Sequence, residues 1–241
     1  MYEERTYRDT IKDALLVNYT VIVKETDLYV RTDTDLRKEV ENSVLKYRHQ
    51  LENYIKKHAE FLTSLVPIDV DPLAPKIIRE MADAAKLADV GPMAAIAGAV
   101  AEFVGRDINA MSRNIIIENG GDIYLKTDVE RNVSIYAGSS VLSNKVGIRI
   151  TPDKSPLGIC TSSGTVGPSL SFGKADAVCI ISKSALIADA AATAAGNVVK
   201  TKKDIEKGLE RAMSIKGVDG VLIIVGDKLG AFGDIELVKI K

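Results

Sequence analysis

The sequence predicts an α+β fold in which a mostly antiparallel sheet carries packed helices. Strand-like runs follow one another over much of the chain, a few helical patterns interrupt them irregularly, and no internal repeat is present. A regular series of alternating strands and helices would instead favour a parallel sheet. The 241 residues can bury a large core. We expect one domain over residues 1–241, with the proline-containing residues 66–75 as a flexible connector, either a domain boundary or an active-site loop.

The first elements are a hairpin and three helices. Residues 17–24 alternate apolar and polar side chains, and residues 28–31 follow a short polar turn, which predicts a β-hairpin. Polar residues 32–35 can cap a helix whose apolar positions recur every three or four residues as far as Leu65, before Pro67. A further helical pattern covers residues 76–87. The Ala/Gly-rich residues 91–105 are expected to pack closely against other backbone.

The remaining elements are mainly strands. Two helices are expected among them, an Ala-rich helix from about residue 184 and a charged amphipathic helix over 201–215. The strands are predicted at residues 115–118, 123–126, 133–136, 146–151, 158–161, 177–181, 221–225 and 235–240.

Composition argues against several classes of partner. The 32 basic and 33 acidic residues are interspersed, and no Trp is present, so nucleic-acid binding is not expected. Residues 1–13 lack the apolar core of a secretory signal, and the apolar residues 185–199 are shorter than the roughly 20 needed for a membrane span. We therefore expect a cytoplasmic protein without a membrane partner.

The cysteines and histidines offer little for catalysis. Cys160 and Cys179 fit neither a disulfide scaffold nor a structural zinc site, and both are expected to be small core residues. His49 and His58 are nine residues apart on a predicted helix, which places them on roughly opposite faces. Any mechanism must then use carboxylates, hydroxyls, backbone amides or a metal ion.

The first candidate site lies on the Ala-rich helix. Asp189, Thr193 and Asn197 are spaced by four residues and share one helix face. A carboxylate beside a hydroxyl suits Mg²⁺, which commonly completes its shell with water and phosphate oxygens. The alternative is a core helix in which Asp189 and Thr193 satisfy nearby backbone amides.

Two loops are further candidates. Thr161, Ser162, Ser163 and Gly164 begin a Gly/Ser loop, residues 161–167, that could bind an anion through its backbone amides or could be a plain turn. The second loop is a predicted hairpin turn, which alone supports no function, at Asn119, Gly120, Gly121 and Asp122.

Three segments, IIIENGGDIYLK, GICTSSG and ADAVCIISKSALIADAAATA, occur in the order of the hallmark segments of the ApbE family. Nearly the whole chain, including VGPMAAIAGAVAEF and SFGKADAV, is similar to the uncharacterised cytoplasmic ApbE-like family. The resemblance to ApbE implies an α+β fold, FAD binding, and Mg²⁺-dependent transfer of FMN to a Ser or Thr of a target protein with release of AMP.

The resemblance also assigns roles to residues. The D-A-x-x-T motif corresponds to residues 189–193 and implies that Asp189 and Thr193 are metal ligands. The N-x-G-G-[DE] turn resembles residues 118–122, with its Asn shifted by one place. The T-S-G segment resembles residues 162–164 or, offset by one, the residues from Thr161 onwards, and both segments would border the flavin cleft. No catalytic residue is assigned.

Two features of ApbE are missing from the sequence. The lysine of its G-[IL]-[AG]-K-G run has no counterpart in residues 98–102. The ApbE segment with a His and an Asp-Pro pair has no counterpart between Gly164 and Asp189.

Three functions follow from the sequence as alternatives. The first is a Mg²⁺-dependent enzyme acting on FAD or another phosphorylated ligand. The second is a non-catalytic protein that binds a flavin or metabolite on the same scaffold. The third is a structural role, with the Ala-rich helix filling the core. Each is compatible with a homo-oligomer.

Overall fold

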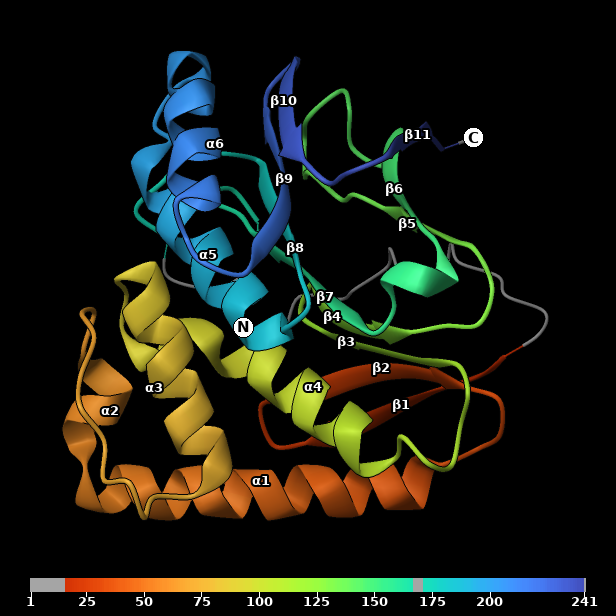
Figure 1. Ribbon diagram of the computed structural model, residues 1–241, viewed down its shortest axis with the longest axis vertical. Coiled ribbons are helices and arrows are strands. Elements are labelled where there is room, and N and C mark those ends of the chain that lie inside the picture. The colour runs from red at the N-terminus through yellow and green to blue at the C-terminus, as the bar shows by residue number, and fades with distance from the viewer. Residues whose placement is uncertain (1–15, 167–170, 241) are drawn as a thin grey trace.

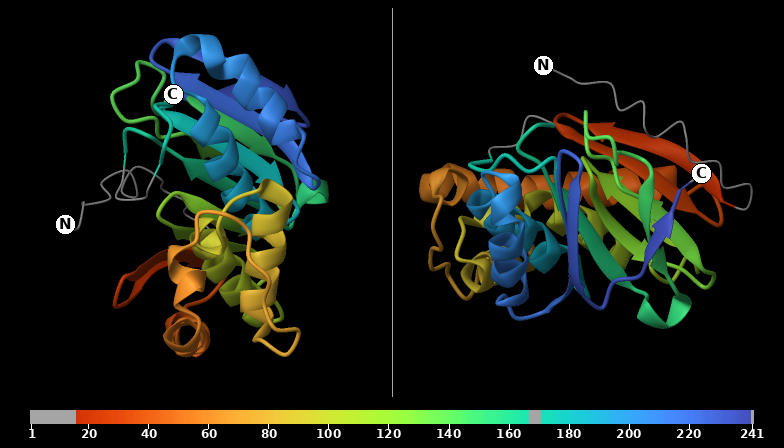
Figure 2. Two further views of the ribbon diagram at one scale, coloured as in Figure 1. Left: turned by 90° about the vertical axis from the view of Figure 1, so that its left-hand side faces the viewer. Right: turned by 90° about the horizontal axis from the view of Figure 1, so that it is seen from above.

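The computed structural model describes residues 16–166 and 171–240, which form three layers (Figure 1). The central layer is an eight-stranded antiparallel sheet of order β1-β2-β3-β4-β7-β8-β9-β10. Helices cover one face of it, and a three-stranded antiparallel sheet of order β11-β6-β5 covers part of the other. The turned views show the same arrangement (Figure 2). The predicted α+β class with a mostly antiparallel sheet is confirmed.

Strands and helices do not alternate regularly along the chain. The strands are β1 (Val17–Val23), β2 (Thr26–Thr32), β3 (Ile115–Asn119), β4 (Asp122–Lys126), β5 (Arg131–Ser134), β6 (Val146–Ile150), β7 (Leu157–Ser162), β8 (Ala177–Ser182), β9 (Val218–Val225), β10 (Lys228–Gly233) and β11 (Leu237–Lys239). The helices are α1 (Arg37–Lys57), α2 (Ala59–Thr63), α3 (Lys76–Ala88), α4 (Ile96–Asp107), α5 (Ala185–Val198) and α6 (Ile205–Met213), with short 3₁₀ turns η2 (Pro92–Ala95), η3 (Pro152–Lys154) and η4 (Lys202–Asp204).

Alternate residues of the central strands enter two separate cores, because successive strand side chains point to opposite faces. On β7, Leu157 and Ile159 face the small sheet while Cys160 faces the helices. On β8, Cys179 faces the small sheet. Both cysteines are therefore buried core residues as expected, but they lie on opposite faces of the sheet.

The structure differs from the predicted elements at two places. The single helix predicted up to Leu65 is broken at His58, whose backbone leaves the helical region while its ring stacks on Tyr54. The break turns Phe61 into the core, where it packs edge-on against Tyr54. In addition, β10 was not predicted. It pairs with β9 through a turn in which Gly226 has a positive φ of 62°.

Helix α4 connects the middle of the sheet to α1. It packs against β3 and β4 and its last residue, Asp107, lies beside α1. The Asp107 carboxylate accepts hydrogen bonds from the hydroxyls of Ser43 at 2.8 Å and Tyr47 at 2.9 Å and from Lys46 at 3.0 Å. These bonds attach the C-terminal end of α4 to α1.

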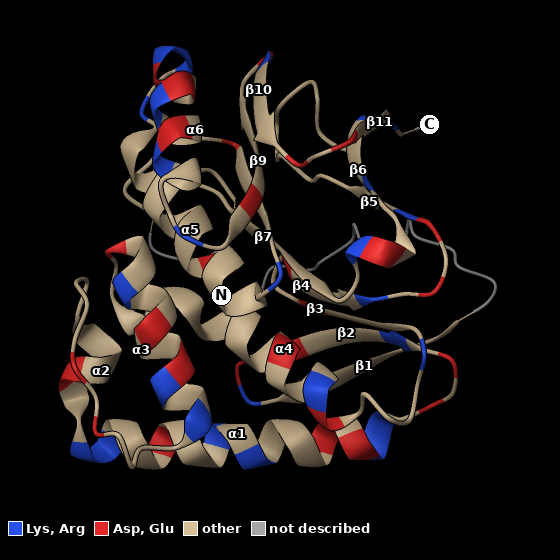
Figure 3. Ribbon diagram, viewed as in Figure 1, with Lys and Arg blue, Asp and Glu red and all other residues tan. Residues whose placement is uncertain are grey.

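Charged residues are distributed over the outer helices. Figure 3 shows Lys and Arg interspersed with Asp and Glu on α1, α3 and α6. Within residues 16–166 and 171–240, no single helix is long and apolar enough to cross a membrane. Residues 76–88 and 92–107 form a bent pair of helices that together have the length and apolar composition of a membrane span, and no other observation supports a span there.

Asp33 connects the end of β2 to the segment before β3. Its carboxylate accepts hydrogen bonds from the amides of Arg113 at 2.7 Å and Asn114 at 3.0 Å, from the Ser112 hydroxyl at 2.9 Å and from the Asn114 side chain at 3.0 Å. Burial would raise the pKa of Asp33, but these bonds, led by the Asn114 amide, outweigh burial and lower the pKa from 3.8 to about 2.

We expect Asp33→Asn to destabilise the fold in a pH-dependent way. Because the folded-state pKa is depressed, the stabilisation is present above the unfolded pKa of 3.8 and is lost as pH falls through about 2. The substitution should lower the free energy of unfolding by about 2 kcal/mol at pH 7 and by much less at pH 2. Urea unfolding at both values measures this, and an equal loss at both would contradict it.

Candidate functional site

Helix α5 lies at the centre of the helical layer. It packs on β7 and β8 and contacts α3, α4 and α6. Its alanines permit close approach of neighbouring backbone. A Cβ added at Gly98 of α4 would lie 2.2 Å from the Ala185 carbonyl oxygen, and one at Gly158 of β7 would lie 2.3 Å from the Ala185 Cα. The first turn of α5 is thus held between two glycines.

The predicted turn between β3 and β4 is confirmed as a two-residue hairpin. Asn119 pairs with Asp122, and Gly120 and Gly121 have φ of 69° and 102°, as a type I′ turn requires. The Gly121 amide donates to the Glu118 carboxylate at 2.9 Å. The turn is also fixed to α4, because the Asn119 side-chain amide donates to the Ala97 carbonyl at 3.1 Å.

The structure brings this turn together with β7 and α5. The Asp122 carboxylate, only 8% exposed, accepts the amide of Thr161 at 3.2 Å. The Cys160 thiol donates to the Ala185 carbonyl oxygen at 3.3 Å and lies near Asp122. The charges of Asp122 and Asp189 interact directly. Three sequence segments predicted to carry the site therefore meet at one carboxylate pair.

Burial dominates the electrostatics of this pair. It raises the pKa of Asp189 to about 7, although the amides of Gly98 and Ala97, which donate to this carboxylate, act in the opposite direction. Burial and then the charge of Asp189 raise the pKa of Asp122 well above its usual range. In the part of the chain that the structure describes, no Lys, Arg or His forms an ion pair with either carboxylate.

Helices α4 and α5 cap each other. The Gly98 amide of α4 donates to Asp189 Oδ2 at 2.9 Å. In return, Glu102 of α4, 4% exposed, accepts the Ala185 amide at 2.6 Å and the Ser184 hydroxyl at 3.1 Å. Each carboxylate thus lies at the positive N-terminal end of the other helix, where negative charge is stabilised. The predicted alternative, in which Asp189 satisfies backbone amides, is seen in this contact.

The other two residues of the predicted helix face differ from Asp189. Thr193 is half-buried, and its hydroxyl makes no hydrogen bond with the residues that the structure describes. The Asn197 side-chain oxygen accepts the amide of Phe172 at 3.1 Å. Thr193 is therefore open to a ligand, whereas Asn197 holds a neighbouring segment.

Several backbone amides of the Gly/Ser loop already donate hydrogen bonds within the protein. The Ser163 hydroxyl accepts the amides of Thr165 at 3.1 Å and Val166 at 3.0 Å. The Gly164 amide donates to the Ala175 carbonyl at 2.8 Å. These three amides are not available to an anion in this conformation. Gly167, the last residue of the predicted loop, lies outside the described residues.

The oxygen atoms at this site suit a hard divalent cation. Mg²⁺ binds one or two carboxylates together with water and phosphate oxygens. Among the described residues, the carboxyl groups of Asp122 and Asp189 form no ion pair with a basic side chain, and the Thr193 hydroxyl forms no hydrogen bond. The described residues contain no group of three or more His, Cys, Asp or Glu arranged to hold a metal. A bound ion would therefore need oxygen atoms from a ligand or solvent.

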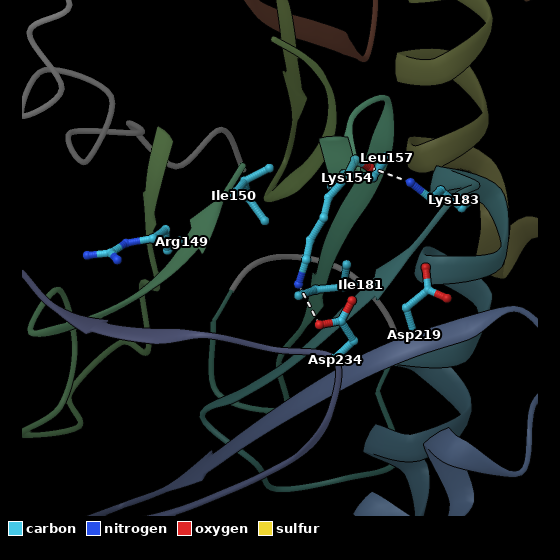
Figure 4. A pocket seen from close by; sticks show the side chains of 8 residues that line it. All are labelled: Arg149, Ile150, Lys154, Leu157, Ile181, Lys183, Asp219 and Asp234. Carbon is cyan, nitrogen blue, oxygen red and sulfur yellow. Dashed lines mark hydrogen bonds and ion pairs between the residues drawn. The ribbon is translucent and has the colours of Figure 1, made fainter. Parts of the chain in front are cut away.

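A separate pocket of about 110 Å³ lies at the opposite end of β7 and β8 (Figure 4). Its cations are already engaged: Lys154 pairs with Asp234 at 2.5 Å, and Lys183 donates to the Lys154 carbonyl. Arg149 extends away from the other lining residues. The pocket brings together none of the predicted site residues.

Solved structures with a similar fold include flavin transferases. The flavin transferase ApbE from Vibrio cholerae is similar with a TM-score of 0.59 at 13% identity, covering 90% of this chain and 96% of that chain. The ApbE protein from Thermotoga maritima has a TM-score of 0.61 at 12% identity, covering 89% and 96%. At these identities the likeness defines the fold.

Sequence comparison shows the family. The model described as "AbpE bacteria" matches residues 8–233, and the chain belongs to this family. A UPF0280 protein of Methanocaldococcus jannaschii is 46% identical over 226 residues, covering 91% of this chain and 92% of the relative. A UPF0280 protein of Methanothermobacter thermautotrophicus is 42% identical over 221 residues, covering 89% and 85%. The predicted ApbE-like membership is confirmed.

Some residues of the site were not predicted. The Gly98 amide donates to Asp189, the Ala97 amide lies near the same carboxylate, and the Cys160 thiol lies near Asp122. The small side chains of residues 91–105 indicated close packing, but backbone contacts carry no residue-type signal. Cys160 was predicted only as a core residue.

Proposed function

We propose that this protein binds Mg²⁺ together with FAD or a related phosphorylated flavin and acts on the diphosphate in the manner of ApbE. The observation that carries the proposal is the buried pair Asp122 and Asp189, which has no basic ion-pair partner among the described residues and lies beside the free Thr193 hydroxyl. Membership of the family and the fold of the flavin transferases support it.

In this proposal Asp189 and Thr193 hold the metal, and Asp122 adds negative charge close by. When bound, Mg²⁺ would stabilise charge developing on phosphoryl oxygens. Residues 119–122 and 161–164 border the flavin phosphates. Among these, the half-buried Ser162 side chain lies on the helix side of β7, near Gly196 of α5, and the Ser163 hydroxyl is already engaged by the loop amides. The Thr161 side chain lies on the opposite face of the sheet, beside Cys179, so only its backbone reaches the site.

The reaction proposed is transfer of FMN to a protein hydroxyl. The hydroxyl oxygen of the acceptor forms a new bond to the FMN phosphorus, the bond to the bridging diphosphate oxygen breaks, and AMP leaves. The hydroxyl proton passes to solvent or to a basic group. Burial favours the protonated form of Asp122 and Asp189, and a shared cation would favour the ionised form that metal binding requires, so metal binding would release protons.

Incubation with FAD and Mg²⁺ tests this proposal. We expect AMP release, detected by chromatography, that EDTA and Asp189→Ala reduce by at least two orders of magnitude, because the metal would be lost. Lys154→Ala, at the distant pocket, is the control and should retain turnover. Saturable FAD binding without AMP release would support the non-catalytic alternative. Absence of any flavin or nucleotide binding would contradict both and leave the structural role.

The setting of this function is also proposed. We place the protein in the cytoplasm, as a single domain whose partner is a small phosphorylated ligand and whose copies can associate. Size-exclusion chromatography with light scattering measures the association directly.

A further inference from the structure

The face of the central sheet that packs against the small sheet continues onto β1, β2 and β3. Directly paired strand residues point to the same face. Arg31 of β2 is paired with Ile116 of β3, which is paired with Leu125 of β4, a residue of the core beneath the small sheet. Because alternate residues of a strand share a face, the β2 and β3 side chains on this face are Asp27, Tyr29, Arg31, Ile116 and Glu118.

Three charged side chains on this face are buried. Asp27, Arg31 and Glu118 are 4%, 5% and 6% exposed, respectively. On β1, which forms the edge of the sheet, Ile22 is paired with Asp27 and is 60% exposed. Among the described residues, the core beneath the small sheet includes no side chain of β1 or β2. Charged side chains on an open sheet face stay largely in water, so a further segment must cover β2 and β3.

We propose that residues 1–15 of the same chain lie across this face of β2 and β3. The segment leads through Leu16 into β1, the strand next to β2, so it starts at the border of the buried face. Its 15 residues span at most about 50 Å when extended. Crossing from β1 to β3 needs about 10 Å, since neighbouring strands lie about 4.8 Å apart. The inference goes beyond the proposed function and does not depend on it.

The charges of the segment and the face are complementary. The segment contains Arg5 and Arg8, and the face carries the carboxylates of Asp27 and Glu118. Arginine binds a carboxylate through two parallel hydrogen bonds and is less strongly hydrated than lysine, which suits a buried pair. A second copy of this face would instead bring its own two carboxylates and one arginine, and would leave an excess of negative charge.

Glu118 connects this cover to the candidate site. Its carboxylate accepts the Gly121 amide at 2.9 Å, in the turn directly before Asp122. A segment that holds Glu118 therefore also fixes the β3–β4 turn, and it does so from the face of the sheet opposite α5.

Trypsin digestion of the full chain, followed by mass spectrometry, tests this inference. Cleavage after Lys12 requires the segment to leave the sheet, so its rate follows the population of the released form. Asp27→Asn should raise this rate by about tenfold or more, because a charged partner is lost. Arg5→Glu combined with Arg8→Glu should do the same without altering the sheet. Hydrogen exchange of residues 115–126, which include the turn, should become faster in both variants.

Asp69→Asn is the matched control, because it makes the same substitution at a side chain that is 97% exposed. It should leave the cleavage rate within about twofold of wild type. Cleavage after Lys12 that is as fast in the wild type as in the variants would overturn the proposal. A dimer in light scattering that Asp27→Asn dissociates would also overturn it, because a second copy would then be the cover. If Asp27→Asn does not fold, as judged by circular dichroism, the double variant of the segment decides the question.

Discussion

Replacing Asp189 with asparagine should stabilise the metal-free protein at pH 8. The folded-state pKa of Asp189 is raised from 3.8 to about 7. The contribution of its protonated form to the free energy of unfolding is therefore fully present below pH 3.8 and is lost as pH rises through about 7. Asparagine has the same shape, cannot ionise, and can still accept the Gly98 amide. We expect a gain on the order of 3 kcal/mol at pH 8 and little gain at pH 4.

Guanidinium unfolding in EDTA at the two pH values measures this effect. Added Mg²⁺ should stabilise the wild type at pH 8 and have little effect on Asp189→Asn. Asp176→Asn is a suitable control. It changes another buried carboxylate, one that accepts the Gly226 amide at 2.6 Å, and should give no gain at pH 8. A loss of stability in Asp189→Asn at pH 8 would show that the carboxylate acts mainly as a cap for α4.

Replacing Gly98 with alanine should destabilise the protein strongly. The added Cβ would lie 2.2 Å from the Ala185 carbonyl oxygen and 3.0 Å from the Asp189 Cβ. Because the obstacle is backbone, no side-chain rotation relieves it, and α4 must move away from α5. Overpacking of this kind costs roughly 1–3 kcal/mol or more. Mg²⁺ affinity should fall as well, since the displaced helix is hydrogen-bonded to Asp189.

Gly196→Ala provides the matched comparison within α5. There the added Cβ would meet Ser162 and Val178 atoms at 3.6 to 3.9 Å, which is ordinary contact. Alanine is favoured over glycine in a helix by about 1 kcal/mol, so this variant should be as stable as wild type or more stable. Thermal unfolding of both variants checks the pair. Equal stability of the two would show that the contact between α4 and α5 tolerates movement.

The strands were predictable where their side chains alternate. Alternate residues of a strand face different cores, which produces recognisable runs of apolar and β-branched residues. Six strands were therefore predicted close to their observed positions: β1, β3, β4, β7, β8 and β9. β10 was missed because its sequence, KLGAFG, is short of β-branched residues and is held by pairing with β9. The break at His58 was missed because the periodic pattern continues through it, and tertiary packing of Phe61 decides the backbone there.

The candidate site was predictable to a different degree at each residue. The spacing of Asp189 and Thr193 identified one helix face, and the hairpin turn at Gly120 was evident from residue type. The approach of Asp122 to Asp189 depends on the register of β4 on β7 and on how α5 lies over them, and neither is local to any motif. The metal and flavin roles of these residues stay predictions.

Helix α4 is held at both of its ends. The Gly98 amide in its first turn donates to Asp189, and Glu102 in its middle accepts the Ala185 amide of α5. Its last residue, Asp107, accepts hydrogen bonds from three side chains of α1. Helix α4 is therefore already fixed in position beside Asp189 before a ligand binds. The protein should lose little conformational entropy when a ligand binds there. Because the same helix is hydrogen-bonded to α1 at one end and to Asp189 at the other, we expect a displacement of α1 to move the Gly98 amide relative to the carboxylate pair.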